Sequence, residues 1–200
     1  MIKIYYVPGT RAIRPVWLCE ELDIAYNREV VSFAPEFRAS PEWRKLNPVG
    51  KVPAMTDGDL TMFESCAMVQ VILDRYGNGQ LEPDKCSNEH AIMQQWSWFA
   101  ESTLARPAGE IINHHRAFGD NPIPEVLAEM VDRVRLCLVA VDNAMVDREF
   151  LIDYGFSVAD IIMGYSLHLA NGRVPFDDLV HVKGYYDRLA ARPAFQRAVA

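Results

Sequence analysis

The sequence predicts two domains, an α/β domain at the N-terminus followed by an all-α domain. Two observations indicate this fold class. Strand-like and helix-like segments alternate over residues 1–77, whereas apolar residues recur at helical spacing over residues 89–200. A third observation marks the boundary: residues 78–88 hold glycine, proline and several polar side chains, as is typical of a linker.

The length and composition of the chain fit this division. Its 200 residues suffice for one large domain or two small ones, and 50% of them are hydrophobic, as in an ordinary globular protein with a core. The net charge of -7 argues against nucleic acid or an anionic membrane as the main partner. The N-terminus lacks a signal-peptide pattern, and no apolar run is long enough to span a bilayer.

The cysteines are widely spaced and form neither a Cys-x-x-Cys pair nor a spacing with histidine that suits a metal. They indicate reduced thiols, so we expect a cytoplasmic protein without a metal site. His114 and His115 do not change this expectation, because neighbours on a helix point about 100° apart and cannot share one ion. The cysteines are Cys19, Cys66, Cys86 and Cys137.

The expected elements of the N-terminal domain follow from short β-branched and aromatic runs, from helical spacing and from proline and glycine punctuation. Their order, strand, helix, strand, hairpin and helix, is that of a thioredoxin-like α/β domain. They are a strand at Ile2–Val7, a helix at Ile13–Leu22, a strand at Tyr26–Val31, an irregular or partly helical segment at Phe33–Lys45, a hairpin of Ala54–Thr56 with Leu60–Phe63, and a helix at Cys66–Tyr76.

The stretch Asn47–Met55 is central to this domain. Two prolines and a glycine exclude a helix there. The hairpin that follows turns at Asp57-Gly58-Asp59, and Asp-Gly is a strong hairpin signal. Ser65 is a suitable N-cap for the next helix.

Apolar spacing predicts only helices in the C-terminal domain. A capping box at Ser157–Asp160 opens a very apolar helix through Leu169, which we expect to form the buried centre of the domain. The other expected helices are a long aromatic-rich one at Glu89–His115 with a kink at Pro107, one at Pro124–Val146, and short ones at Val182–Leu189 and Pro193–Val199.

The motif Asn-Pro-x-Gly-Lys-Val-Pro-Ala at residues 47–54, followed by Glu64–Ser65 at a helix start, resembles the glutathione site of cytosolic, bacterial-type glutathione S-transferases. Phe156–Ile161 resembles that family's buried capping box, and Arg192–Phe195 resembles its C-terminal helix. The resemblance covers nearly the whole chain. It implies the two-domain glutathione transferase fold and a cis peptide bond before Pro53.

The resemblance also implies where glutathione binds. The backbone of Val52, turned outward before Pro53, pairs with the peptide-like ligand as with an added strand. The helix N-terminus at Ser65 suits the γ-glutamyl carboxylate, and the Glu64 carboxylate suits the ammonium group. Lys51 and Arg38 are candidates for the glycine carboxylate. The alternative for both is a solvated surface charge, which we favour for Arg38.

A glutathione transferase must stabilise a thiolate, because the thiol is the weaker nucleophile. Thr10 stands where many relatives have a catalytic serine, and a hydroxyl that donates to sulfur lowers the pKa of a thiol. Arg11 adds positive potential at the helix start. Tyr6 is the competing donor, since other classes use a tyrosine near this strand end. Relatives with a catalytic cysteine carry it at the position of Arg11, and this chain lacks it.

The function that the resemblance implies is conjugation of the glutathione thiolate to small hydrophobic electrophiles, with glutathione as co-substrate. A glutathione-dependent peroxidase, dehalogenase or isomerase on the same site is one alternative, and a non-catalytic interaction protein of this fold is the other. We also expect a homodimer, because the long helix carries many aromatic residues, namely Trp96, Trp98 and Phe99.

Two pairs on the long helix leave alternatives open. Glu101–Ser102 either reaches the ligand of a neighbouring subunit, as acidic residues do in some relatives, or forms an exposed helix face. His114–His115 either walls a hydrophobic-substrate pocket with Phe118 or is polar surface.

Overall fold

The computed structural model describes all 200 residues, and the chain forms two compact units. One unit comprises Met1–Leu81 together with Arg192–Ala200, and the other comprises Glu82–Ala191. The sequence pattern assigns Arg192–Ala200 to the helical domain, whereas the structure packs this segment into the first unit.

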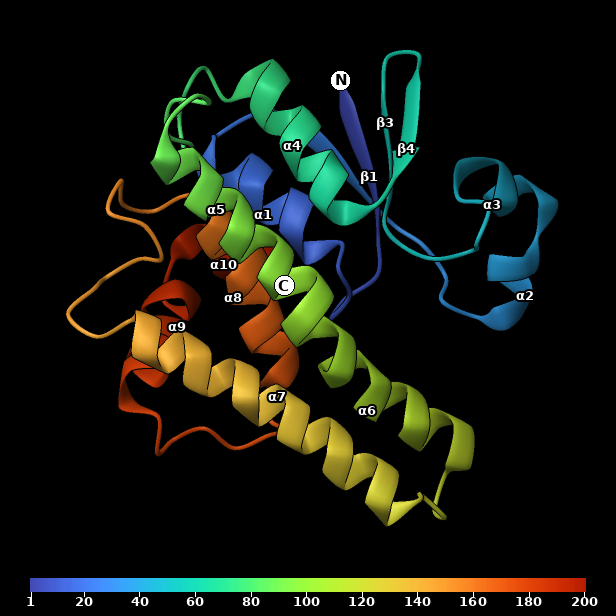
Figure 1. Ribbon diagram of the computed structural model, residues 1–200. Helices are drawn as coiled ribbons and strands as arrows, with labels where there is room; N and C mark the ends of the chain where they lie inside the picture. The colour runs from blue at the N-terminus through green and yellow to red at the C-terminus, as the bar shows by residue number, and fades with distance from the viewer. The chain divides into compact units, whose positions relative to one another are not determined.

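The first unit is built on a four-stranded mixed sheet with the strand order β2-β1-β3-β4 (Figure 1). β1 is parallel to β2 and antiparallel to β3, which pairs antiparallel with β4. This topology confirms the thioredoxin-like fold of the N-terminal domain. The strands are β1 (Ile2–Tyr6), β2 (Tyr26–Val30), β3 (Ala54–Asp57) and β4 (Leu60–Phe63).

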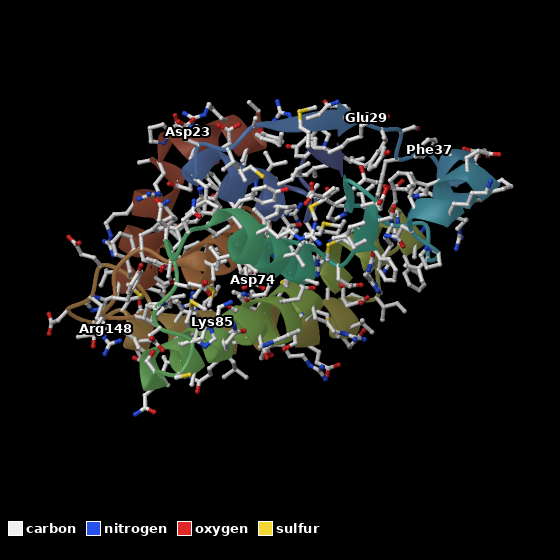
Figure 2. The ribbon with its side chains drawn as sticks, turned by 90° about the horizontal axis from the view of Figure 1, so that it is seen from above. Asp23, Glu29, Phe37, Asp74, Lys85 and Arg148 are labelled. Carbon is white, nitrogen blue, oxygen red and sulfur yellow. The ribbon has the colours of Figure 1, made fainter.

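Helices complete the first unit, and prolines begin three of them, as the fixed φ of proline allows at a first turn. The segment at residues 33–45, expected to be irregular or partly helical, forms α2 and α3. Figure 2 labels Phe37, which projects from α2. The helices are α1 (Ile13–Glu21), α2 (Pro35–Ala39), α3 (Pro41–Leu46), α4 (Ser65–Tyr76) and α10 (Pro193–Val199).

Helix α10 belongs to the first unit because it packs along α1. The Trp17 ring meets the Phe195 ring edge-on, with 4.7 Å between the ring centroids. Just before α10, Arg192 donates two hydrogen bonds of 2.7 and 2.8 Å to the Glu21 carboxylate. These two residues are 171 positions apart, so no local pattern in the sequence indicates the contact.

The second unit is entirely helical, and α8 is buried along nearly its whole length, as expected for its centre. The expected capping box is confirmed: Asp160 accepts from the backbone and hydroxyl of Ser157, and it also accepts from the Tyr185 hydroxyl at 2.6 Å. None of the helices is both long and apolar enough to cross a membrane. The elements are α5 (Asn88–Trp98), η1 (Phe99–Leu104), α6 (Ala105–Phe118), α7 (Pro124–Ala144), α8 (Val158–Ala170) and α9 (Val180–Ala190).

A π-helical segment, η1, interrupts the long helix at Phe99–Leu104, just before Pro107, where the sequence predicts a kink. Proline has no N–H to donate, so the Thr103 carbonyl, four residues earlier, loses its helical partner. The Cys137 thiol on α7 donates to this carbonyl instead, at 3.6 Å. Burial raises the pKa of the Cys137 thiol, which keeps the proton that makes this contact. The distortion therefore begins before the proline, because the missing hydrogen bond lies there.

Candidate functional site

The loop after α3 is held by backbone contacts and by one arginine. The side chain of Asn47 is buried and accepts from the Val49 N–H at 3.2 Å, while the Gly50 N–H donates to the Asn47 carbonyl at 2.9 Å. Arg44 donates to the Pro48 carbonyl at 2.5 Å and to the Arg38 carbonyl at 3.0 Å. These contacts fix the path of the loop that leads into Lys51.

Gly50 is required where the loop passes the end of α2. Its φ is +65°, which L side chains rarely adopt. A Cβ added there would lie 2.4 Å from the Arg38 carbonyl oxygen, well inside contact distance. The glycine of the motif therefore serves the packing of the loop against α2.

The peptide bond between Val52 and Pro53 is cis, which confirms that expectation. The β3–β4 ladder begins at the pair Ala54 and Phe63 and leaves the backbone of Val52 outside it. Because Ala54 pairs with Phe63, the residues before β3 and those after β4 lie at the same end of the hairpin. Val52 and Glu64 are thus brought to one place.

Glu64 is the N-cap of α4 and has a φ of +75°, and its side chain is exposed and makes no capping bond. The prediction that Ser65 is the N-cap is wrong by one position: Ser65 is the first helical residue, and its side chain is buried. The positive φ of Glu64 turns the chain directly into the helix, which leaves no capping role for the serine. Non-glycine residues with such backbone angles concentrate at functional sites.

Arg14 is a site residue that sequence reasoning missed. It lies on α1, is 0% exposed, and donates from Nη1 to the Ser65 hydroxyl at 3.2 Å and to the Cys66 sulfur at 3.7 Å. A guanidinium beside the N-terminus of α4 adds to the positive potential of the helix end, and both favour an anion. The available signal was a lone charge within the apolar run Ile13–Leu18.

The two candidate thiol donors lie in different surroundings. Tyr6 is 1% exposed, and its hydroxyl donates to the Ala198 carbonyl of α10 at 2.9 Å. Burial raises the pKa of Tyr6, and its hydrogen bond ties α10 to the sheet. Thr10 lies half-buried in the turn before α1, where its hydroxyl donates to the Val7 carbonyl at 2.6 Å. Arg11 follows it and is half-buried.

The two candidates for the glycine carboxylate also differ. Lys51 is exposed beside Val52. Arg38 is half-buried on α2, and its guanidinium carbon lies 4.6 Å from the centroid of the Phe33 ring, in cation–π geometry. Arg38 thus packs on Phe33. The alternative expectation, a solvated surface charge, does not account for this contact.

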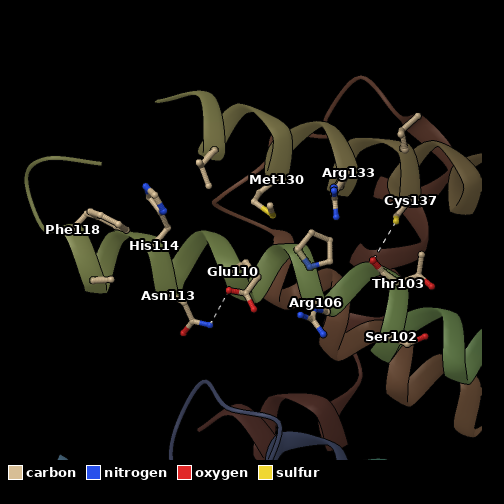
Figure 3. A pocket seen from close by; sticks show the side chains of 14 residues that line it. Ser102, Thr103, Arg106, Glu110, Asn113, His114, Phe118, Met130, Arg133 and Cys137 are labelled. Atoms are coloured by element: carbon tan, nitrogen blue, oxygen red, sulfur yellow. Dashed lines mark hydrogen bonds between the residues drawn. The ribbon is translucent and has the colours of Figure 1, made fainter. Parts of the chain in front are cut away.

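A pocket of about 880 Å³ lies within the second unit, between α6 and α7 (Figure 3). His114 is buried there and stacks on Phe118, with 4.5 Å between the centroids, whereas His115 is exposed. Of the pair Glu101–Ser102, only Ser102 lines this pocket. The residues that line it are Ser102, Thr103, Arg106, Pro107, Glu110, Asn113, His114, Ala117, Phe118, Val126, Met130, Arg133, Leu136 and Cys137.

Comparison with known proteins finds similarity to glutathione S-transferases and to an elongation factor. Residues 1–74 match the family model of the glutathione S-transferase N-terminal domain. A probable glutathione S-transferase of Oryza sativa subsp. japonica, GSTF1, is 27% identical over 100% of this chain and 95% of its own length. Elongation factor 1-gamma 3 of the same plant is 23% identical over 80% of this chain and 39% of its own length.

A solved structure shares the fold of the chain. It is a glutathione transferase family member from Pseudomonas fluorescens Pf-5 with two glutathione bound. Its TM-score is 0.88 at 25% sequence identity, and the match covers 99% of this chain and 92% of that one. The similarity therefore extends over both units.

Proposed function

We propose that this chain, which has the two-domain fold of the glutathione S-transferases and carries their N-terminal domain, is a glutathione transferase. Its reaction is the addition of the glutathione thiolate to small hydrophobic electrophiles. One observation carries the proposal: Val52, which precedes a cis proline, and Glu64–Ser65, at a helix N-terminus, lie at the same end of one hairpin.

Glutathione binds along this end of the hairpin. The Val52 backbone, outside the β-ladder, pairs with the cysteinyl part of the ligand. The N-terminus of α4 holds the γ-glutamyl carboxylate, with the charge of Arg14 behind Ser65, and the exposed Glu64 carboxylate holds the ammonium group. Lys51 is exposed beside Val52 and is the preferred partner of the glycine carboxylate.

The thiolate is stabilised by Thr10, with Arg11 adding positive potential. In the structure the Thr10 hydroxyl donates to the Val7 carbonyl at 2.6 Å. To stabilise the thiolate, this hydroxyl would have to donate to the glutathione sulfur instead. Tyr6 is a poorer donor, because its hydroxyl is buried and already bonded to Ala198.

A second candidate function is a non-catalytic interaction role. The similarity to elongation factor 1-gamma 3 favours this alternative, because that relative is not named as a transferase. A peroxidase, dehalogenase or isomerase would use the same glutathione site with another electrophile. Binding of glutathione together with turnover of an aryl halide separates the transferase from both alternatives.

The protein is proposed to be a cytoplasmic homodimer that acts in detoxification. Trp98 is 60% exposed on α5, which supports an interface there, whereas Trp96 packs on Phe99 with 5.3 Å between the centroids. Light scattering that gives a single 22.7 kDa species would contradict the dimer. Assignment to a bacterial-type subclass stays a prediction, because the relatives above come from rice as well as from Pseudomonas.

Calorimetry with glutathione tests the binding site. Glu64→Ala should weaken binding by about 1.5–3 kcal/mol, since a charge-assisted contact is lost. Glu36→Ala, an exposed carboxylate at the start of α2, is the matched control and should bind as the wild type does. Equal affinity of Glu64→Ala and wild type would remove Glu64 from the site.

A pH titration of thiolate absorbance in the glutathione complex tests the donor. Thr10→Ala should raise the pKa of the bound thiol and slow turnover of an aryl halide, while glutathione affinity stays nearly unchanged. Thr10→Ser should keep most of the activity because it retains the hydroxyl. If Thr10→Ala behaves as the wild type while Tyr6→Phe loses activity, the tyrosine is the donor and the assignment is wrong.

A further inference from the structure

The loop between α3 and β3, residues 47–53, presents Lys51 and Val52 to the proposed glutathione site. Neither residue belongs to a helix or to the β-ladder, so their positions depend on what holds the loop at its two ends. At one end, the cis bond before Pro53 leads into β3. At the other end, the loop leaves α3 at Asn47, which is the C-cap of that helix. The contacts at this second end are those that bear on how the ligand binds.

Asn47 closes the loop on itself. Its buried side chain accepts from the Val49 N–H at 3.2 Å and donates to the Pro53 carbonyl at 3.5 Å, while its own carbonyl accepts from the Gly50 N–H at 2.9 Å. All of these partners lie within the loop. They set its internal shape, but they leave its place relative to α2 to other contacts.

Arg44 of α3 joins the loop to α2. Its Nη1 donates to the Pro48 carbonyl of the loop at 2.5 Å, and its Nε donates to the Arg38 carbonyl of α2 at 3.0 Å. Hydrogen bonds from a charged donor are roughly twice as strong as neutral ones. The donors of a guanidinium also lie in one rigid plane, so a single side chain fixes the separation of the two carbonyls.

The guanidinium of Arg44 also lies against Gly50. A Cβ added to Gly50 would come within 3.1 Å of both Nε and Cζ of Arg44, in addition to its 2.4 Å approach to the Arg38 carbonyl oxygen. The loop, the guanidinium and the end of α2 therefore meet at one point. Without the guanidinium, the loop loses its support there, and Lys51 and Val52 can move with it.

Helix α2 depends on such contacts to stay beside the loop. It has five residues, buries none of them, and lies to one side of the sheet with α3 (Figure 1). Its Phe37 ring packs on the buried Trp43 ring of α3, with 5.2 Å between the centroids. So short a helix is not stable by itself in water. The hydrogen bond from Arg44 to the Arg38 carbonyl therefore stabilises both α2 and the loop.

We propose that Arg44 is a positioning residue for glutathione binding. It holds α2 and the loop together and so keeps the backbone of Lys51 and Val52 where the tripeptide pairs with it. It acts through the loop, whereas Lys51 is the direct partner of the glycine carboxylate. This inference rests on the proposed glutathione site, and it adds that the affinity of the site depends on a side chain that does not touch the ligand.

Calorimetry with two ligands tests whether Arg44 acts through the loop. The ligands are glutathione and glutathione amide, in which a neutral carboxamide replaces the glycine carboxylate. Arg44→Met should weaken the binding of both by the same factor, about tenfold, because both pair with the loop. Lys51→Met should weaken only glutathione. If Arg44→Met weakens glutathione and leaves the amide unaffected, Arg44 binds the glycine carboxylate directly and the proposal is wrong.

Lys45→Met is the matched control, because it removes an exposed cation from the same helix. It should bind both ligands as the wild type does. Arg44→Lys should recover part of the affinity, since an ammonium group keeps the charge but lacks the planar fork. With an aryl halide, Arg44→Met should raise the KM for glutathione about tenfold and leave kcat and the pKa of the bound thiol unchanged. A lowered kcat with an unchanged KM would contradict a positioning role.

Hydrogen exchange in the ligand-free protein separates this proposal from that of the function. In Arg44→Met, the Val49 and Gly50 amides should exchange about tenfold faster than in the wild type. The Met68 amide, which donates to the Glu64 carbonyl in α4, should keep its rate. Unchanged exchange in the loop would show that Arg44 does not hold it. A wild type that binds no glutathione would instead contradict the proposed function, whatever the exchange rates are.

Discussion

The glutathione site of the first unit and the α6–α7 pocket of the second are built from different parts of the chain. The first site relies on the backbone: a cis bond before Pro53, a positive φ at Gly50 and Glu64, and the N-terminus of α4. The second relies on side chains that two helices direct into a common space. A backbone site should be sensitive to the conformation of a few residues, whereas a side-chain pocket should be sensitive to volume and charge.

Of the variants that test this difference, Gly50→Ala is expected to have the largest effect, which is a loss of glutathione affinity. The added Cβ would lie 2.4 Å from the Arg38 carbonyl, and the φ of +65° is unfavourable for alanine, so the loop that presents Val52 must move. We expect about a hundredfold loss of glutathione affinity, or about 3 kcal/mol. Calorimetry measures the affinity, and circular dichroism shows whether the helices are unchanged.

Gly58→Ala is the matched control for this change. Gly58 also has a positive φ, but nothing lies within 4 Å of an added Cβ at the tip of the hairpin. It should cost about 1 kcal/mol of stability and leave glutathione affinity intact. If both glycine variants bind glutathione equally well, the site does not depend on the backbone of the loop.

Arg14→Met is expected to have the second-largest effect. It removes the buried charge that donates to the Ser65 hydroxyl, so the γ-glutamyl carboxylate should lose favourable potential. Glutathione affinity should fall about tenfold, while the affinity of cysteinylglycine, which lacks that carboxylate, should change little. Arg14→Lys should recover part of the loss. An equal drop for both peptides would indicate that Arg14 only supports the fold.

The smallest expected effect concerns the far end of the hairpin. Tyr76 and Arg75 of α4 each donate to the Asp57 carboxylate at 2.8 Å. The hydrogen bond from Tyr76 is the main cause of the lowered pKa of Asp57. Since the folded-state pKa lies below the unfolded one, this stabilisation is present above about pH 4 and is lost as the pH falls through the folded value.

Asp57→Asn should therefore lower the free energy of unfolding by about 1 kcal/mol at pH 7, with a smaller difference at pH 3. Urea denaturation at both pH values measures it. Glutathione affinity should not change, because Asp57 pairs with Leu60 at the opposite end of the hairpin from Val52. A constant difference between the two pH values would show that the carboxylate charge plays no part.

Local patterns determined most of the secondary structure. The run before Pro8, the Asp-Gly turn and the capping box at Ser157 gave strand, hairpin and helix boundaries that agree with the structure to within a few residues. Such features depend on residues close in sequence, so they can be recognised without knowledge of the fold. The same holds for the motif at residues 47–54, whose prolines restrict the backbone and whose glycine permits a positive φ.

Tertiary structure alone decided the remainder. It placed α10 with the first unit through Arg192 and Glu21, which are 171 positions apart, and it occupied the Tyr6 hydroxyl with Ala198. It also put the charge of Arg14 beside Ser65. These contacts depend on which helix faces meet, and helical spacing in one segment says nothing of its partner. The α6 side of the pocket, with His114 and Phe118, was one of the alternatives that the sequence left open, whereas its α7 side was not predicted. A cavity belongs to two surfaces and to neither segment by itself.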